Sequence, residues 1–316
     1  MQAGRGETRS ALSGRLSVLL IAIVAVQVLG NLGVLVLEHH ALPSSKRGAF
    51  TDHVKDVMST LLPGSAPVRP LPATPRGTHS APDVYSVVVP TYNERENIPL
   101  IVWMLVDVFR DRPERLEVVV VDDNSPDGTR DVVRKLQREY GSDVVKLRER
   151  PGKLGLGTAY KDGLTVVTGS WVVLMDADLS HDPRDIVRFV ERQRETGSDI
   201  VVGTRYAAGV YGWDVVRKIT SLGANILAST LLWPGVTDLT GAFRLYRADV
   251  LRLLMEETKS EGYAFQMETI VRAKAYGFKV VEVPIVFVDR LYGESKLGGA
   301  EVVAYLKGLV RLVFTL

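Results

Sequence analysis

The chain has 316 residues, of which 46% are hydrophobic and 24% are charged, a composition that is ordinary for a globular protein and excludes collagen-like and broadly disordered chains. It contains no cysteine, which excludes disulfides, thiolate zinc sites and cysteine nucleophiles. The 39 lysines and arginines nearly balance the 37 aspartates and glutamates, so no global basic charge indicates nucleic-acid binding.

The first 83 residues differ in character from the rest. Residues 16–37 form an uncharged apolar segment, which as a helix is long enough to cross a hydrocarbon core of about 30 Å. We expect a retained membrane anchor here; a cleaved signal or transit segment and a buried core helix are the alternatives. Basic residues occur both in segment 1–15 and after the apolar segment, so the positive-inside rule barely discriminates between the two orientations.

The segment that follows, residues 38–83, is rich in proline. Because closely spaced prolines prevent a continuous helix, we expect a semi-rigid, extended linker. The remainder, residues 84–316, is predicted to be one domain.

Within this domain, short apolar runs rich in β-branched residues alternate with amphipathic stretches. The runs that predict strands are residues 85–89, 117–121, 172–175, 200–202 and 280–288. Helical periodicity is clear in residues 98–109 and 130–140. Strands that alternate with helices indicate βαβ units and a mainly parallel sheet. In such sheets ligands bind beyond the carboxyl ends of the strands, so residues that directly follow the strands are candidates for a functional site.

Polar residues follow the first two predicted strands. Pro90, Tyr92 and Glu94 follow the first one and offer a ring and a carboxylate to a planar base. The alternative is an ordinary strand-to-helix turn in which Glu94 favours the helix dipole. Asp123 ends the second strand, where its carboxylate could accept from a nucleobase N–H or hold a cation. Asp127 is expected to cap the following helix.

Two carboxylates, Asp176 and Asp178, follow the apolar run 172–175. Hard divalent cations prefer oxygen ligands, and Mg²⁺ typically uses one or two carboxylates together with substrate phosphates. At the end of a buried strand, this pair predicts a clamp for a metal-bound diphosphate. The alternative is that one of the two caps the next helix, for which Asp182 is better placed.

Isolated basic residues recur further along the chain. Arg205 closes another strand, Arg217 and Ser221 have the spacing of one helix face, and Arg290 and Lys296 follow the last predicted strand. Each alone is typical of a solvated surface. Their positions after strands nevertheless indicate a pocket for an anion, because arginine and lysine both bind phosphate.

These motifs, in this order, resemble those of the dolichol-phosphate mannose synthases, which are GT-A-type members of glycosyltransferase family 2. The segments that carry the resemblance are Pro90–Glu94, Asp122–Asp123, Asp176–Asp178, Gly203–Tyr206, Tyr211–Asp214, Asp238–Gly241 and Asp289–Lys296. Residues 92–97, 125–131 and 292–299 are similar to the eukaryotic branch. The resemblance covers residues 84–316 and implies an α/β GT-A fold, with a Rossmann-like, mainly parallel sheet flanked by helices.

The resemblance also implies roles for matched residues. Those that would line the nucleotide-sugar pocket are Pro90, Tyr92, Glu94, Val121, Asp123, Asp176, Ala177, Asp178, Arg205, Arg290 and Lys296. Asp176 and Asp178 would hold a Mg²⁺ or Mn²⁺ ion, with Asp178 as the direct ligand. Asp178 and Arg205 are the candidate catalytic residues. Arg205, Arg217 and Ser221 would engage the acceptor phosphate.

The implied reaction is the inverting transfer of mannose from GDP-mannose to dolichyl phosphate. The product is dolichyl β-D-mannosyl phosphate, the mannose donor for N-glycan precursors, GPI anchors and O-mannosylation. Because an acceptor phosphate is largely a dianion at neutral pH, no general base is required. Glu268 is therefore expected to be structural or sugar-contacting. Ser180, which stands where some relatives have a metal-assisting glutamine, receives no role.

Two alternatives to this function remain. One is a dolichyl-phosphate glucosyltransferase that uses UDP-glucose, and the other is a nucleotide-sugar-binding subunit without turnover. A lipid acceptor implies a membrane partner, and the apolar residues 222–233 and 302–316 are candidates for contact with lipid or for core packing. Small membrane-anchored regulatory subunits, on which eukaryotic relatives rely, are candidate partners, and nucleic acid is not. The expected location is the endoplasmic reticulum membrane, with the catalytic domain facing the cytosol.

Overall fold

A computed structural model describes residues 83–206, 210–211, 235–260, 262, 264–289, 307–309 and 311–312, together with positions 223, 225, 228 and 232. The predicted segments 1–15 and 16–37, and the linker up to residue 82, lie outside these residues. The anchor, the linker and the domain boundaries therefore stay predictions. Within the described part of the chain, no helix is both long and apolar enough to cross a membrane.

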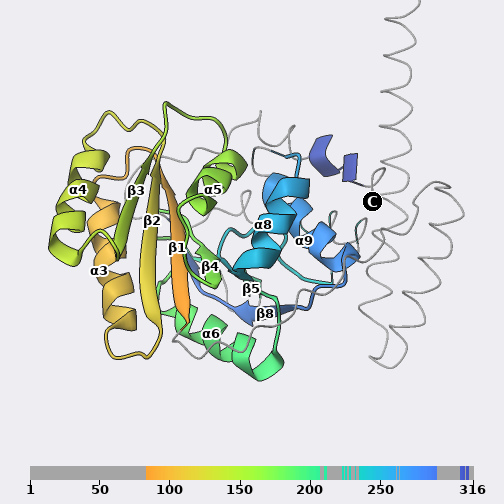
Figure 1. Cartoon of the computed structure of the whole chain (residues 1–316). Helices are drawn as coiled ribbons and strands as arrows, with labels where there is room; N and C mark the ends of the chain where they lie inside the picture. Colours follow the sequence, from red (N-terminus) through yellow and green to blue (C-terminus); the bar gives the residue numbers. More distant parts are fainter. Residues whose placement is uncertain are drawn as a thin grey trace, which may run out of the picture. The chain divides into compact units, whose positions relative to one another are not determined.

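The framework is a seven-stranded sheet with the strand order β3-β2-β1-β4-β7-β5-β8 (Figure 1). Its strands are β1 (Val84–Thr91), β2 (Arg115–Asp122), β3 (Val145–Glu149), β4 (Trp171–Leu174), β5 (Ile200–Thr204), β7 (Arg244–Arg247) and β8 (Val280–Pro284). Every neighbouring pair is parallel except the two that involve β7, which runs antiparallel to both β4 and β5. The predicted mainly parallel sheet is confirmed, with β7 as the exception.

A second sheet has two parallel strands, β6 (Val210–Tyr211) and β9 (Phe287–Val288). The single strand predicted over residues 280–288 is therefore wrong. The strand β8 stops at Pro284 because β5, its only neighbour in the main sheet, ends at Thr204. The chain then continues into a different sheet.

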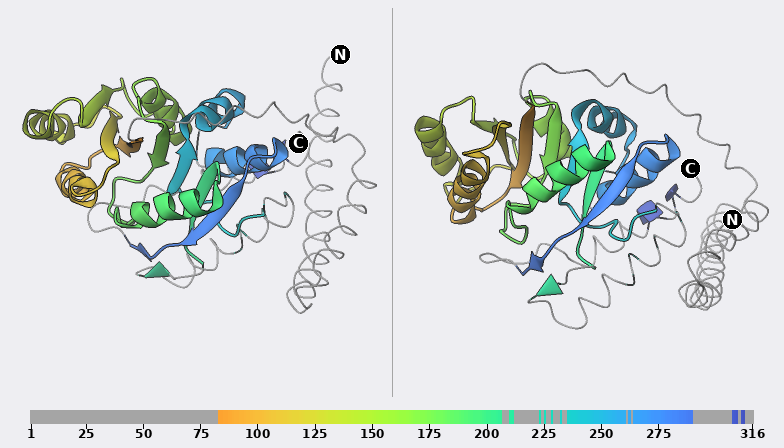
Figure 2. Two further views of the ribbon diagram at one scale, coloured as in Figure 1. Left: turned by 60° about the horizontal axis from the view of Figure 1, so that its bottom comes forward. Right: turned by 90° about the horizontal axis from the view of Figure 1, so that it is seen from below.

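Helices cover both faces of the main sheet (Figure 2). They are α3 (Asn97–Phe109), α4 (Thr129–Tyr140), α5 (Leu156–Leu164), α6 (Asp185–Thr196), α8 (Ala248–Glu257) and α9 (Ala264–Ala275). One core cluster joins the sheet to α3, α4 and α6, and the other joins it to α5, α8 and α9. Successive valines of β2 alternate between the two clusters, as the period of a strand requires. Because both faces are covered, most residues of β1, β2 and β4 are apolar and buried.

The carboxyl ends of β1, β2, β4 and β5 share one edge of the sheet. The antiparallel strand β7 begins at this same edge, since Arg244 pairs with Leu174 at the end of β4 and with Val202 near the end of β5. Residues that precede β7 therefore lie beside residues that follow β4 and β5. This edge contains the predicted site.

Candidate active site

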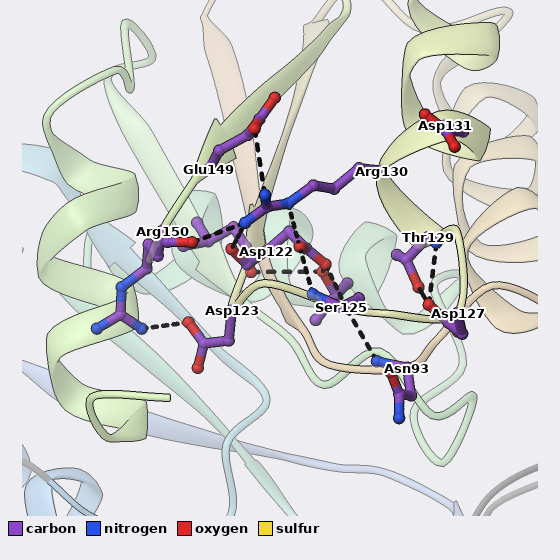
Figure 3. Close-up of polar contacts among 12 residues, drawn as sticks. Asn93, Asp122, Asp123, Ser125, Asp127, Thr129, Arg130, Asp131, Glu149 and Arg150 are labelled. Atoms are coloured by element: carbon purple, nitrogen blue, oxygen red, sulfur yellow. Dashed lines mark hydrogen bonds and ion pairs between the residues drawn. The ribbon is translucent and has the colours of Figure 1, made fainter. Parts of the chain in front are cut away.

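The two adjacent carboxylates at the end of β2 have different environments (Figure 3). Asp122 is fully buried and accepts hydrogen bonds from Nε of Arg130 (2.6 Å), from Oγ and the backbone N of Ser125 (2.5 and 3.0 Å) and from Oγ1 of Thr91 (3.1 Å). Because both of its oxygens are engaged, Asp122 stabilises the loop between β2 and α4. Only Asp123 remains as a ligand-binding candidate.

Asp123 is held from one side by a buried arginine. Its Oδ1 accepts from Nη1 of Arg150 (2.5 Å), and Arg150 is itself fixed by Asp162 (2.9 Å) and Thr158 (2.6 Å). Oδ2 has no hydrogen-bond partner among the described residues, and 14% of the side chain is exposed. Burial raises the pKa of Asp123 above its ordinary value, and the Arg150 guanidinium opposes that rise. The carboxylate is therefore oriented with one oxygen available to a ligand.

The loop after β1 places an aromatic ring and a carboxylate at the same edge. Tyr92 is half-buried, and Nζ of Lys153 lies 3.5 Å from its ring centroid. Glu94 is buried, and its Oε2 accepts from Nδ2 of Asn97 (2.7 Å), while its backbone N donates to Oγ1 of Thr129 (3.1 Å). Glu94 thus fixes the start of α3. The alternative interpretation placed Glu94 in the first turn of this helix, and the structure places it just before that turn.

Pro90 and Val121 are directly paired in the register of β1 and β2. Pro90 is half-buried, whereas Val121 is fully buried and belongs to the core cluster on the α5 face. Its side chain packs against Gly163, so a contribution of Val121 to the pocket would have to come from its backbone. The N-cap residue of α4 is Gly128, and Asp127, one position earlier, accepts with Oδ1 from the backbone N of Thr129 (3.0 Å), so it stabilises the start of the helix from just outside the predicted position.

Asp176 and Asp178 lie directly beyond the buried strand β4, separated by the buried Ala177. Oδ1 of Asp178 accepts from the backbone N (3.1 Å) and Oγ (2.5 Å) of Ser180. Ser180, which received no role from the sequence, therefore orients the predicted metal ligand.

The chemistry of this donor set fits a divalent cation. Among the described residues, no group of three or more histidine or carboxylate side chains could hold a metal by itself. Two carboxylates that leave other positions to substrate phosphates are what Mg²⁺ and Mn²⁺ sites for diphosphates typically provide. Asp176 and Asp178 could therefore hold such an ion together with a bound diphosphate.

A buried histidine, which the sequence analysis did not single out, packs behind these carboxylates. The ring of His181 stacks on Phe243 at a centroid distance of 4.9 Å and meets Phe287 edge-on at 5.4 Å. Burial lowers the pKa of His181 to about 4, against the opposing effect of Asp178, so the imidazole is neutral at physiological pH.

Arg205, at the end of β5, is held rigidly by a residue that precedes β7. Its Nε and Nη2 donate to the two carboxylate oxygens of Asp238 (2.6 and 2.7 Å), and Nη2 also donates to Oγ1 of Thr240 (2.7 Å). Burial opposes ionisation of both partners. The Arg205 charge nevertheless lowers the pKa of Asp238, and the Asp238 charge raises that of Arg205. Asp176 contributes to the second effect, so a predicted metal ligand acts on the guanidinium.

Glu268 has a structural role. It accepts from the backbone N of Lys259 (3.2 Å), from the backbone N and Oγ of Ser260 (3.1 and 2.6 Å) and from Nε of Arg272 (2.9 Å). Burial would raise its pKa, but these hydrogen bonds lower it below the ordinary value, so the carboxylate is ionised. Of the two predicted roles for Glu268, the contacts support the structural one.

Four predicted phosphate-binding residues lie outside the described part of the chain. They are Arg217, Ser221, Arg290 and Lys296. Asp289, the last described residue before Arg290, follows β9, in which the backbone N of Val288 donates to the carbonyl of Ser180 (3.2 Å). The chain therefore passes beside the Asp178 loop immediately before Arg290.

Residues 86–254 match the family model described as glycosyl transferase family 2. The chain belongs to this family. It is 40% identical over 237 residues to a polyprenol monophosphomannose synthase from Mycolicibacterium smegmatis, an alignment that covers 73% of this chain and 86% of the relative. It is 39% identical over 218 residues to an undecaprenyl-phosphate mannosyltransferase from Micrococcus luteus, covering 67% and 86%. Both relatives are bacterial, so they lend no support to the predicted eukaryotic branch.

Solved structures confirm the GT-A fold. Glucosyl-3-phosphoglycerate synthase from Mycobacterium tuberculosis, in a complex with Mn²⁺ and UDP, superposes with a TM-score of 0.56 at 17% identity, covering 74% of this chain and 81% of that one. Mannosyl-3-phosphoglycerate synthase from Rubrobacter xylanophilus gives a TM-score of 0.53 at 18% identity, covering 73% and 72%. At these identities the likeness extends to the fold alone.

Proposed function

We propose that the protein transfers mannose from GDP-mannose to a polyprenyl phosphate, with dolichyl phosphate as the predicted acceptor and with inversion at the anomeric carbon. The observation that carries the proposal is the single sheet edge at which Asp123, the Asp176–Asp178 pair and the fixed Arg205 lie. The names of the two bacterial relatives support mannose as the sugar and a polyprenyl compound as the acceptor.

The donor would bind with its base at β1 and β2 and its diphosphate at β4. Asp123 offers one carboxylate oxygen to the base, and Tyr92 offers a ring. Asp176 and Asp178 would hold the Mg²⁺ or Mn²⁺ ion, which when bound neutralises charge on the diphosphate and so makes it a better leaving group.

Arg205 supplies a second positive charge for the transition state. As an oxygen of the acceptor phosphate forms a bond to C1 of mannose, the bond from C1 to the β-phosphate oxygen breaks and its electrons remain on GDP. Because Asp238 and Thr240 already hold the Arg205 guanidinium, it needs no reorganisation as this charge develops. The phosphate dianion has no proton to lose, so no residue need act as a base. Attack from the face opposite GDP inverts the configuration.

Further phosphate contacts are proposed from the resemblance alone. Arg217 and Ser221 would bind the acceptor phosphate, and Arg290 and Lys296 would bind the donor diphosphate. The predicted regulatory subunits, and the location in the endoplasmic reticulum membrane with a cytosolic site, stay predictions.

The decisive experiment offers radiolabelled GDP-mannose or UDP-glucose to the purified full chain with dolichyl or undecaprenyl phosphate. We expect label in the lipid extract from GDP-mannose only, and a β configuration at the anomeric carbon by NMR. Glucolipid without mannolipid would refute the proposed sugar. No lipid product from either donor would favour a subunit that binds without turnover.

A further inference from the structure

Lys153 lies at the base-binding end of the candidate site without an assigned role. It is exposed, and its ammonium covers the Tyr92 ring at 3.5 Å from the centroid. Among the described residues it has no hydrogen-bond or ion-pair partner. Its charge also acts on Asp123, where it lowers the carboxyl pKa. One lysine thus lies close both to the aromatic ring and to the carboxylate that are placed to receive a base.

The segment that carries Lys153 is fixed at both ends. Arg150 is buried and bonded to Asp123, Asp162 and Thr158, and α5 begins at Leu156. The backbone between these points therefore keeps Lys153 beside Asp123. The four-carbon side chain can still move its ammonium from the face of the ring to its edge when a planar base takes its place.

A carboxylate that faces positions 1 and 2 of a purine, with an ammonium that faces position 6, suits the hydrogen-bonding edge of guanine. Guanine presents two neighbouring donors, N1–H and the 2-amino group, and next to them an acceptor, the 6-carbonyl. In the same register, adenine and cytosine present an amino group where guanine has this carbonyl, so the ammonium would face a hydrogen-bond donor. Uracil places its single N–H between two carbonyls, one of which would face the carboxylate.

We infer that Lys153 is a specificity-determining residue that donates to the 6-carbonyl of guanine while Oδ2 of Asp123 accepts from N1–H and the 2-amino group. The inference rests on the proposed function, since it concerns the base of the proposed donor. It adds the residue by which this chain selects a guanine nucleotide over other nucleoside diphosphates.

The test measures binding of three diphosphates to the full chain by calorimetry: GDP, UDP and 2-aminopurine riboside 5′-diphosphate, which lacks the 6-carbonyl and the N1–H but keeps the 2-amino group. The variants are Lys153→Ala and Lys153→Arg, with Lys135→Ala, an exposed lysine of α4, as the matched control. We expect Lys153→Ala to weaken GDP about tenfold and to leave the 2-aminopurine analogue unchanged, because a good base contact contributes this much discrimination. Lys153→Arg should restore most GDP affinity, and Lys135→Ala should match the wild type.

Other outcomes overturn the inference in separate ways. Equal weakening of GDP and the analogue would show that Lys153 acts on the phosphates or on the fold. Unchanged GDP affinity in Lys153→Ala would show that it does not contact the base. Tighter binding of UDP than of GDP by the wild type would refute the proposed donor itself. This outcome is distinct from the first two, which concern only the role of Lys153.

Discussion

Asp238 is predicted to be the residue on which both the stability of the site and the orientation of Arg205 depend. It is fully buried, and its two oxygens accept from Nε and Nη2 of Arg205 and from the backbone N of Gly241 (2.9 Å). In Asp238→Asn, one carboxylate oxygen becomes an amide NH₂ that faces donors, and the buried guanidinium loses its counter-charge. Removing one partner of a buried ion pair costs about 3–5 kcal/mol.

The assay is urea unfolding of the full chain followed by tryptophan fluorescence, together with the rate of mannosyl transfer. Asp238→Asn should lose about 3–5 kcal/mol of unfolding free energy. It should also lower kcat more than it raises KM, because Arg205 would be displaced while the base contacts remain. The matched double variant Arg205→Met/Asp238→Leu should be more stable than the sum of the two single losses predicts, since no charge is left buried and unpaired. A loss below about 1 kcal/mol for Asp238→Asn, or strict additivity, would refute this reasoning.

Three further predictions concern the metal, the core and pH. Asp178→Asn should reduce mannosyl transfer by about 100-fold or more, as should EDTA in the wild type, whereas the neighbouring Asp182→Asn should retain activity; equal rates for the two variants would contradict the metal assignment. Gly163→Ala should lower the unfolding free energy by about 1–3 kcal/mol in a urea titration, because the new Cβ would lie 2.6 Å from Cγ1 of Val88. The control Gly152→Ala should be nearly neutral, because a Cβ at that position meets nothing within 4 Å. Between pH 6.5 and about 4 the unfolded chain binds a proton at His181 that the folded chain does not, so stability should fall by about 3 kcal/mol as the pH is lowered; His181→Gln should lack this loss in urea titrations across that range.

The central strands and their helices could be predicted because the spacing of apolar residues along the chain indicates which side chains are buried. The runs at 85–89, 117–121 and 172–175 are apolar except for Ser86 and Glu117, since helices cover both faces of the sheet. The strand β3 has a charged sequence, VKLRE, and was not singled out. The strand β7, with the sequence RLYR, lies inside the sheet yet carries two arginines. Arg244 donates to the carbonyls of Leu239 and Gln266, and Arg247 pairs with Asp199, contacts that the sequence does not reveal.

In the candidate site, too, some residues could be predicted from the sequence and others could not. Residues that follow parallel strands, such as Asp123, Asp178 and Arg205, could be predicted from their positions. The counter-charge of Arg205 could not, because Asp238 lies 33 residues further along the chain and precedes a strand. The sequence also could not separate Asp122 from Asp123, since only the structure shows that Arg130 and Ser125 engage the first and Arg150 orients the second.

The reversed direction of β7 has a consequence for how this enzyme could change its substrates. The chain leaves the sheet after Arg205 and returns through Asp238, and both points lie at the same edge. The intervening stretch, which includes Arg217 and Ser221, thus begins and ends beside the reaction centre. Within this stretch, Asn225 donates to Oγ1 of Thr240 (2.8 Å) and Ala228 is buried in the core, so these two positions are tied to the rest of the domain. We therefore predict that grafting this stretch from a relative with a different polyprenyl acceptor, with Asn225 and Ala228 kept, transfers acceptor preference and leaves the donor choice proposed for β1 and β2 unchanged.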